Sequence, residues 1–186
     1  MHTKETIILG IDPGTNIFGY GVIRILDKKI ELIALGSVDL SKYDNHQLKL
    51  KYIFERVRYL VDEYKPDHCA IEAPFFGKNV QSMLKLGRAQ GVSMAAVLTR
   101  DIPIEEYSPR KVKQAITGNG NSSKEQVAAM LQTICKFKEL PKNLDATDGL
   151  AVAICHHFQS SGKINTSTKA KDWSAFVKAN PNRIKG

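Results

Sequence analysis

Apolar and polar positions follow two different spacings along the chain, and the spacing predicts where strands and helices lie. Short apolar runs rich in branched residues and bounded by turn residues are typical of buried strands. Such runs occupy residues 6–11, 19–25, 30–38, 68–73 and 103–107. Apolar residues three and four positions apart, together with capping residues, predict helices. Helices are expected over residues 45–64, 79–100 and 109–118, after Ser123, and over 144–158.

The order of these elements predicts an α/β domain with a five-stranded mixed sheet flanked by helices. The first three strands follow one another through tight connections, which favours an antiparallel meander. Ser108 before Pro109 predicts a helix start, and residues 122–126 contain two overlapping capping boxes. Gly91 lies in the second predicted helix, where we expect it to permit close packing.

Composition changes near residue 160 and suggests how the chain is divided. Residues 1–159 carry the apolar periodicity of a folded domain, whereas residues 160–186 are polar, basic and poor in such periodicity. We therefore expect one domain over 1–159 and a basic, flexible tail over 160–186. The chain has 186 residues, a length that suits a single domain.

The net charge of +8 points to polyanionic partners, although a soluble protein that is merely basic remains an alternative. No window approaches the roughly 20 apolar residues of a membrane span, so no membrane association is expected. The N-terminus lacks the pattern of a signal peptide, which favours a cytoplasmic protein. The three cysteines are far apart and form no C-x-x-C pair, so buried reduced thiols are expected.

Four carboxylates stand out by their positions. Asp12 closes the first predicted strand, Glu72 closes the fourth, and Asp145 and Asp148 lie near the start of the last helix. A charge directly after an apolar run is costly unless it is paired or binds a metal. Residues three apart share a helix face, so Asp145 and Asp148 point the same way. If the first and fourth strands are neighbours, Asp12 and Glu72 converge on that helix face.

Clustered carboxylates without histidine or cysteine suit hard cations such as Mg²⁺, with Mn²⁺ as a substitute. Two such ions about 4 Å apart can clamp the attacking and leaving oxygens of a phosphodiester. Each acid also has a purely structural alternative. Asp12-Pro13-Gly14 is a good turn sequence, Asp145 is placed to cap a helix, and Glu72 suits an ion pair.

Several segments, in order, carry a resemblance to the RuvC family of Holliday junction resolvases. The matching segments are Ile8–Gly14 with Gly19–Ile23, Ala70–Glu72 with Phe75 and Lys78-Asn79, Leu84–Gly87 with Gln90-Gly91, Tyr107 with Arg110, Val112–Gln114 and Gly118 to Gly120, and Asp145–Ala151. Any one segment is moderately specific, and all of them in register are strongly specific. Gly149 stands where many members have alanine, which weakens the helix slightly.

This resemblance implies a ribonuclease H-like fold and an endonuclease that nicks two strands of a four-way junction symmetrically. The products would carry 5′-phosphate and 3′-hydroxyl ends. The implied catalytic and Mg²⁺-binding residues are Asp12, Glu72, Asp145 and Asp148. The implied partners are junction DNA, a second copy of the chain, and the branch-migration proteins RuvA and RuvB.

DNA-binding residues follow from the same resemblance. An aromatic side chain just past the metal site can stack on an unpaired base, which is the role implied for Phe75. Basic side chains can hold the phosphate or stabilise its developing charge. The basic residues implied are Lys78, Lys85, Arg88, Arg110, Lys113 and Lys124. A core phenylalanine and solvated lysines are the structural alternatives.

Three other functions share some of these features. Gly10–Thr15 resembles the first phosphate loop of actin-like ATPases and sugar kinases, but the chain lacks their second glycine-rich loop. A catalytically silent DNA-binding scaffold and a nuclease for RNA–DNA hybrids are the other two. His156 and His157 are adjacent and point to different helix faces, so a joint catalytic site is not expected.

Overall fold

A computed structural model describes residues 5–74, 79–137, 139, 141 and 143–163, apart from the side chains of residues 162 and 163. Its centre is a five-stranded sheet with the order β3-β2-β1-β4-β5. The strands are β1 (Thr6–Asp12), β2 (Ile17–Leu26), β3 (Lys29–Asp39), β4 (His68–Glu72) and β5 (Ile104–Tyr107). Each predicted strand is confirmed, with ends that differ by at most two residues from the apolar runs.

The pairing of the strands brings the two strand-end acids together. β1, β2 and β3 form the expected antiparallel meander, whereas β1 pairs with β4, and β4 with β5, in parallel. Ile11 pairs with Ile71 across the central pair of strands. Asp12 and Glu72 follow directly, so they leave the same edge of the sheet on neighbouring strands.

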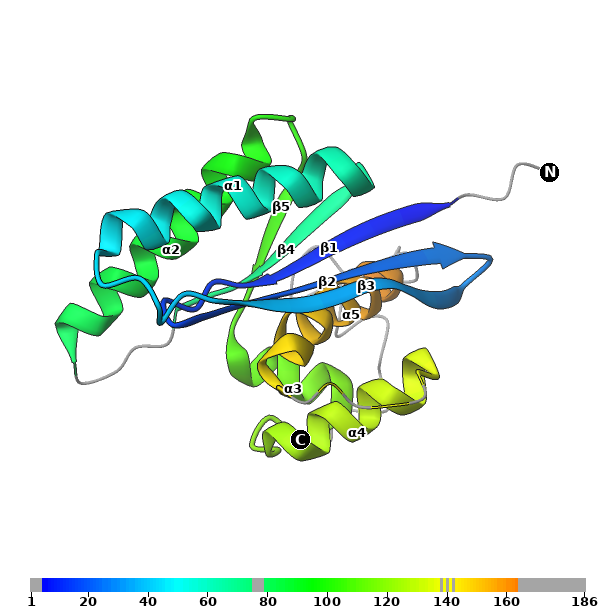
Figure 1. Cartoon of the computed structure of the whole chain (residues 1–186). Coiled ribbons are helices and arrows are strands. Elements are labelled where there is room, and N and C mark those ends of the chain that lie inside the picture. Colours follow the sequence, from blue (N-terminus) through cyan, green and yellow to red (C-terminus); the bar gives the residue numbers. More distant parts are fainter. Residues whose placement is uncertain (1–4, 75–78, 138, 140, 142, 164–186) are drawn as a thin grey trace, which may run out of the picture.

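Helices cover both faces of the sheet (Figure 1). α1 (His46–Tyr64) and α2 (Val80–Leu98) pack on one face, and α3 (Pro109–Thr117), α4 (Lys124–Cys135) and α5 (Asp145–Lys163) on the other. Each face has its own apolar core, one built on Leu9 and Ile11 and the other on Ile8 and Ile23. These residues alternate along β1 and β2, as expected for strands buried on both sides.

Capping explains where the helices begin. Ser108 caps α3 with Pro109 in its first turn, and Ser123 and Gln126 form a reciprocal capping box on α4. Both features confirm the sequence predictions. α5 runs to Lys163, five residues past the predicted end, so it crosses the domain boundary expected at residue 159. Residues 164–186, the rest of the expected tail, lie outside the described residues.

Close backbone packing occurs at α5 and not at the glycine we expected. Gly91 is exposed, and an added Cβ there would meet no atom within 4 Å, so its predicted packing role is wrong. A Cβ on Gly149 of α5 would instead lie 2.4 Å from the Cα of Tyr20 on β2. One on Gly10 of β1 would lie 2.1 Å from the carbonyl oxygen of Gly149. The glycines let the start of α5 lie directly on the sheet beside Asp12.

The remaining expectations concern the membrane and the cysteines. Within the described residues, no helix is both long and apolar enough to span a bilayer. Cys69 and Cys155 are buried and Cys135 is partly buried, and all three are free thiols. Burial raises the pKa of Cys135 and of Cys155 to about 11, which keeps these thiols protonated and unreactive at neutral pH.

Candidate active site

The strand-end acids and the acids of α5 meet at one pocket, of about 260 Å³. It lies where the carboxyl ends of β1 and β4 face the first turns of α3, α4 and α5. The lining residues are Asp12, Glu72, Pro109, Val112, Lys113, Lys124, Val127, Asp148 and Ala151. Three of the four predicted acids and two of the predicted basic residues therefore share one pocket, and Asp145 joins them through Lys124.

Asp12 and Glu72 are held in an environment that disfavours their charge. Burial, followed by the nearby charge of Asp148, raises the pKa of Asp12 to about 7. Burial, followed by the charge of Asp12, raises the pKa of Glu72 to about 8. No ion pair of Glu72 is found among the described residues, which disfavours the simple structural role considered for it.

In the turn after Asp12, the Gly14 N–H donates to the Asp12 backbone carbonyl at 3.0 Å. The turn therefore leaves the carboxylate free for other contacts.

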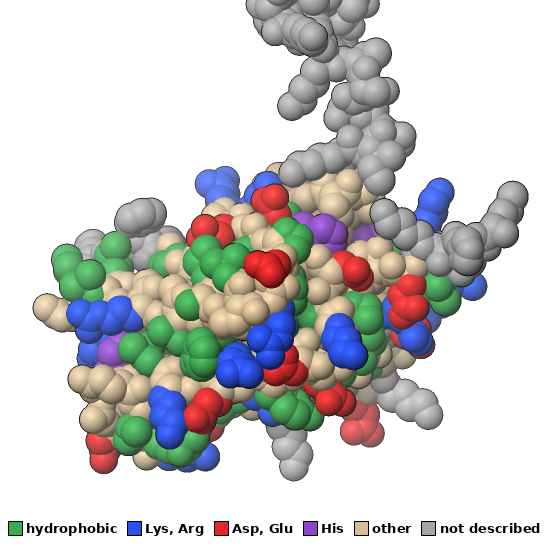
Figure 2. All heavy atoms as spheres, turned by 90° about the horizontal axis from the view of Figure 1, so that it is seen from above, with side chains coloured by type: hydrophobic (Ala, Val, Ile, Leu, Met, Phe, Trp, Pro, Cys, Tyr) green, Lys and Arg blue, Asp and Glu red, His purple; other side chains and the backbone are tan. Residues whose placement is uncertain are grey.

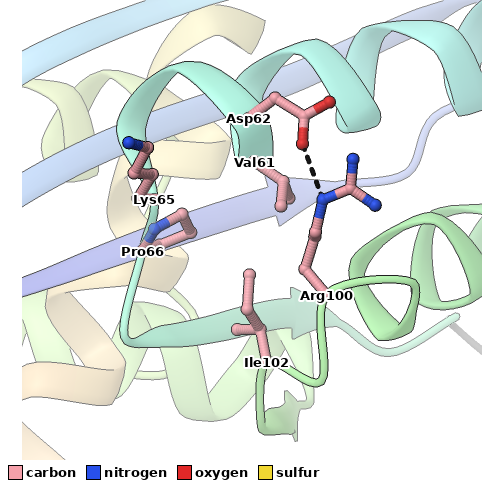
Figure 3. A pocket seen from close by; sticks show the side chains of 6 residues that line it. All are labelled: Val61, Asp62, Lys65, Pro66, Arg100 and Ile102. Carbon is pink, nitrogen blue, oxygen red and sulfur yellow. Dashed lines mark hydrogen bonds and ion pairs between the residues drawn. The ribbon is translucent and has the colours of Figure 1, made fainter.

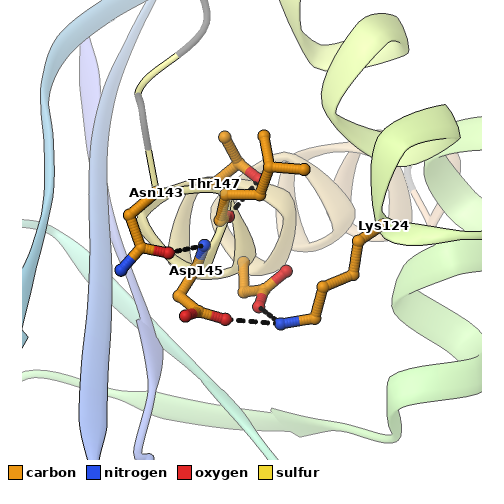
Figure 4. Close-up of polar contacts among 6 residues, drawn as sticks. Lys124, Asn143, Asp145 and Thr147 are labelled. Atoms are coloured by element: carbon orange, nitrogen blue, oxygen red, sulfur yellow. Dashed lines mark hydrogen bonds and ion pairs between the residues drawn. The ribbon is translucent and has the colours of Figure 1, made fainter.

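The two acids of α5 share one ammonium group (Figure 4). Lys124 Nζ lies 2.5 Å from Asp145 Oδ1 and 2.8 Å from Asp148 Oδ2. The helix start is capped by Asn143, whose side chain accepts a hydrogen bond from the Asp145 N–H at 3.0 Å. Because Asn143 performs the capping, the Asp145 carboxylate is available to face Lys124. Asp145 is therefore not merely a helix cap.

Positive charge at the pocket comes from Lys124 and Lys113. Burial opposes the charge of Lys124, but its hydrogen bonds to Asp145 and Asp148 raise its pKa overall. Burial raises the pKa of Asp148 even though Lys124 acts in the opposite direction. Lys113 lowers the pKa of Glu72 through its charge, but less than burial raises it. Two ammonium groups thus face four carboxyl groups, and the carboxylates are incompletely neutralised by the protein.

This donor set fits a hard divalent cation. It consists of carboxylate oxygens, and the raised pKa values of Asp12 and Glu72 show that their charged forms lack compensation. Within the described part of the chain, no three Asp, Glu, His or Cys side chains are already arranged as a metal cage. Lys124 bridges two of the acids instead. Binding of a cation would therefore require these side chains to adjust.

The other predicted DNA-binding residues lie outside this pocket. Arg110 is exposed on α3, and its side chain packs against Gly120. Lys85 lines a separate hollow at the start of α2, and Arg88 lies one turn further along this helix. Phe75 and Lys78 lie outside the described residues.

Two other features of the structure do not join the site. His156 is buried on α5, where its Nδ1 lies 2.9 Å from the hydroxyl of Tyr107, and it does not line the pocket. A hollow of about 340 Å³ lies between the end of α1 and the segment after α2 (Figure 3). There Arg100 Nε donates to Asp62 Oδ1 at 2.8 Å, so the two charges satisfy one another.

Sequence reasoning missed three contributors to the site. The Lys124 bridge depends on the approach of α4 to α5, which no local pattern encodes. The cap at Asn143 was overlooked, although an asparagine two residues before Asp145 is a recognisable signal. Gly149 was judged only by its helix propensity, whereas its contact with β2 sets the position of Asp148.

Comparison with known proteins agrees with this geometry. Residues 8–156 match the family model for crossover junction endodeoxyribonuclease RuvC. The RuvC of Christiangramia forsetii is 62% identical over 98% of this chain and 94% of the relative. That of Porphyromonas gingivalis is 56% identical over the full length of both chains.

Solved structures show the same relationship. Thermus thermophilus RuvC in complex with a Holliday junction substrate superposes with a TM-score of 0.78 at 31% identity, covering 85% of this chain and 96% of that one. A yeast mitochondrial Holliday junction resolvase superposes with a TM-score of 0.63 at 14% identity, which bears on the fold alone. These matches confirm the ribonuclease H-like α/β fold, and the chain belongs to the RuvC family of crossover junction endodeoxyribonucleases.

Proposed function

We propose that this chain resolves Holliday junctions by metal-dependent hydrolysis of one phosphodiester in each of two strands, with Asp12, Glu72, Asp145 and Asp148 holding the metal. The observation that carries the proposal is that three of these acids line one pocket and the fourth, Asp145, shares Lys124 with Asp148, with too little positive charge to neutralise them. We propose Mg²⁺ as the metal, since the donors are all oxygens. The products would carry 5′-phosphate and 3′-hydroxyl ends.

The protein's own groups divide the work within the pocket. A bound divalent cation supplies the Lewis acidity that activates water and stabilises the departing oxygen. Asp12 and Glu72 are fixed by the ends of two paired strands, which keeps their carboxylates in place without reorganisation. Lys113 and Lys124 donate to the phosphate as its negative charge develops. Lys124 pairs with Asp145 and Asp148 in the structure, and it would be free for this role if a bound cation neutralised these two acids.

A homodimer would provide the two sites that symmetric nicking requires. Along α2, Val80, Leu84 and Leu98 are 64%, 50% and 54% exposed. Added side-chain atoms at Gly87 and Gly91 would meet nothing within 4 Å. These five positions fall at intervals of four, three, four and seven residues, the spacing of one helix face. Figure 2, which looks down on the layer of α1 and α2, shows hydrophobic side chains at the surface among Lys and Arg. We assign this α2 face to contact with a second copy.

The rest of the proposal concerns junction DNA and partner proteins. Phe75 would stack on a base at the crossover, and the backbone contacts would come from Lys78, Lys85, Arg88 and Arg110. The chain would act in the cytoplasm with the branch-migration proteins RuvA and RuvB. We propose residues 1–159, extended by the end of α5 to Lys163, as the nuclease domain, and the residues that follow as a basic tail.

The direct experiment compares two substrates of the same sequence. Purified protein is incubated with a synthetic four-way junction and with linear duplex, with and without Mg²⁺. We expect paired, symmetric, ligatable nicks in the junction alone, and only with metal. Junction binding without cleavage under these conditions would favour a silent scaffold. Cleavage of an RNA–DNA hybrid in preference to the junction would favour the other nuclease function.

A further inference from the structure

A second hollow, of about 270 Å³, shares none of the lining residues of the carboxylate pocket. It forms where the loop after β1 meets the first turns of α1 and α2. The lining residues that matter here are Thr15, Asn16, Asp44, His46, Lys49 and Lys85. Thr15 and Asn16 lie three and four residues past Asp12, so the hollow is on the same edge of the sheet as the carboxylate pocket.

Positive charge predominates at this hollow. Lys49 and Lys85 line it. The positive charges of Arg88, Lys85 and Lys49 are all close enough to lower the pKa of His46. Lys49 Nζ donates to Asn16 Oδ1 at 3.3 Å, and none of the three cations has an ion pair among the described residues. Asp44 is the opposing carboxylate in the lining, and it is exposed. The balance of charge therefore favours an anion.

Two helix starts add to this field. Asn45 caps α1 and Asn79 caps α2, and neither helix has an acidic residue in its first turn. The partial positive charge of a helix N-terminus favours anions and falls off within about one turn. It thus reinforces the field of Lys49 and Lys85, both of which lie within the first two turns of their helices.

His46 supplies an unsatisfied hydrogen-bonding group. Its Nε2 atom is buried and has no hydrogen-bond partner among the residues that the structure describes. Leaving such an atom unpaired is unfavourable, so a partner at this position is expected in the functional state. Burial, followed by the charges of Arg88, Lys85 and Lys49, lowers the pKa of His46. The imidazole is therefore neutral at physiological pH, and its Nε2–H tautomer can donate to an oxygen without adding charge.

We propose that this hollow binds a non-scissile phosphate of the junction backbone, held by Lys49, Lys85 and His46. The proposal rests on the proposed function, since junction DNA is the source of the phosphate. A phosphodiester provides an anion and several acceptor oxygens, which match two ammonium groups and one imidazole donor. Anchoring one backbone phosphate here would set the register in which the scissile phosphate reaches the carboxylates.

The test combines three variants with chemically altered junctions. Binding of a fluorescent four-way junction without metal is measured over a range of salt concentrations. The variants are Lys49→Ala/Lys85→Ala, His46→Ala, and Lys51→Ala as a matched control. Lys51 lies two residues from Lys49 on α1, is exposed, and pairs with Glu55 at 3.7 Å. A second series replaces single phosphates of the junction by neutral methylphosphonates.

We expect the double variant to bind about tenfold more weakly. The slope of log affinity against log salt concentration, here called the salt slope, should fall in magnitude by about 0.9, the value for one phosphate contact. Lys51→Ala should leave the slope unchanged. In the wild-type protein, one non-scissile methylphosphonate should weaken binding, and this effect should disappear in the double variant. His46→Ala should reduce the same effect without changing the slope, because a neutral donor is lost.

Two results would overturn the proposal. One such result is a double variant whose loss of affinity and change in salt slope are only twice those of Lys51→Ala. The other is a double variant that is as sensitive as the wild type to the critical methylphosphonate. Either result would mean that the hollow binds no phosphate. Wild-type cleavage, measured on the same junction with Mg²⁺, tells this failure from failure of the proposed function. If either result occurs and the wild type cleaves normally, the phosphate site is refuted and the proposed function stands. If the wild type neither prefers the junction nor cleaves it, the phosphate site and the proposed function are both refuted.

Discussion

Replacing Asp12 with asparagine should stabilise the metal-free protein while abolishing cleavage. The pKa of Asp12 is raised from 3.8 to about 7, chiefly by burial and then by Asp148. A pKa raised in the folded state means that this state holds its proton while the unfolded chain loses it. The stability from this group is therefore fully present below about pH 4 and is lost as the pH rises through 7.

The size of the effect follows from the same values. A rise from 3.8 to about 7 corresponds to about 4 kcal/mol of lost stability at pH 8. Asparagine is neutral in both states and removes this loss, but its buried amide costs about 1–3 kcal/mol where hydrogen bonds are missing. The net gain is about 1–3 kcal/mol at pH 8. At about 2–4 °C per kcal/mol for a chain of this size, the melting temperature should rise measurably.

The assay is thermal unfolding in EDTA at pH 5, 7 and 8, followed by circular dichroism. Asp12→Asn should melt above the wild type at pH 8, and the difference should shrink toward pH 5. Mg²⁺ should reverse the order, because the wild type gains binding energy that the variant has lost. Asp27→Asn, in the exposed turn between β2 and β3, removes the same charge and should change little. A pH-independent difference, or a variant less stable than the wild type at pH 8, would refute the electrostatic argument.

Other variants test the remaining parts of the site. Lys124→Met should bind Mn²⁺ more tightly in calorimetry, because a competing ammonium group is removed, and should cleave poorly; weaker binding would mean that Lys124 organises the carboxylates. Gly149→Ala gains about 1 kcal/mol of helix propensity but places a Cβ 2.4 Å from Tyr20 Cα. Since overpacking costs about 1–3 kcal/mol, urea unfolding should show a net loss of up to about 2 kcal/mol. An unchanged stability would show that α5 moves freely. Leu84→Glu should yield monomers in analytical ultracentrifugation and lose symmetric double nicking, and a dimer that survives would place the interface elsewhere.

The sequence predicted the fold best where a local pattern is compatible with only one kind of secondary structure. Apolar runs on β1 and β4 have no helical spacing, and the crossover through α1 requires parallel pairing if these strands are adjacent. The convergence of Asp12 and Glu72 was predicted on the condition that these strands are neighbours, and the observed pairing meets that condition. The family match then confirmed the activity and the fold, while the roles of the individual acids stay predictions.

Local patterns failed where the deciding contact joins distant segments. Gly91 and Gly149 look alike in a helical sequence, yet Gly91 is exposed and Gly149 touches β2. The five extra residues of α5 contain no proline, and the helix continues through Gly162 to Lys163. The Lys124 bridge joins residues 21 and 24 positions apart, and neither distance is a helical or strand period.

The close packing of α5 also explains how a self-repelling site persists in a folded protein. The acids of α5 would relieve their repulsion with Asp12 if the helix moved away from the sheet. Such a movement would break the backbone contacts of Gly149 with Gly10 and Tyr20 and open a gap in a core where Leu150 is fully buried. Losing one buried leucine alone costs about 2–5 kcal/mol, which is comparable to the roughly 4 kcal/mol that burial and the neighbouring acids together cost ionised Asp12. The charge therefore stays concentrated, and a divalent cation relieves it with little movement of the backbone. Because the metal-free site is electrostatically strained, a bound divalent cation would lower that strain and would therefore gain binding free energy, while the fold stays intact.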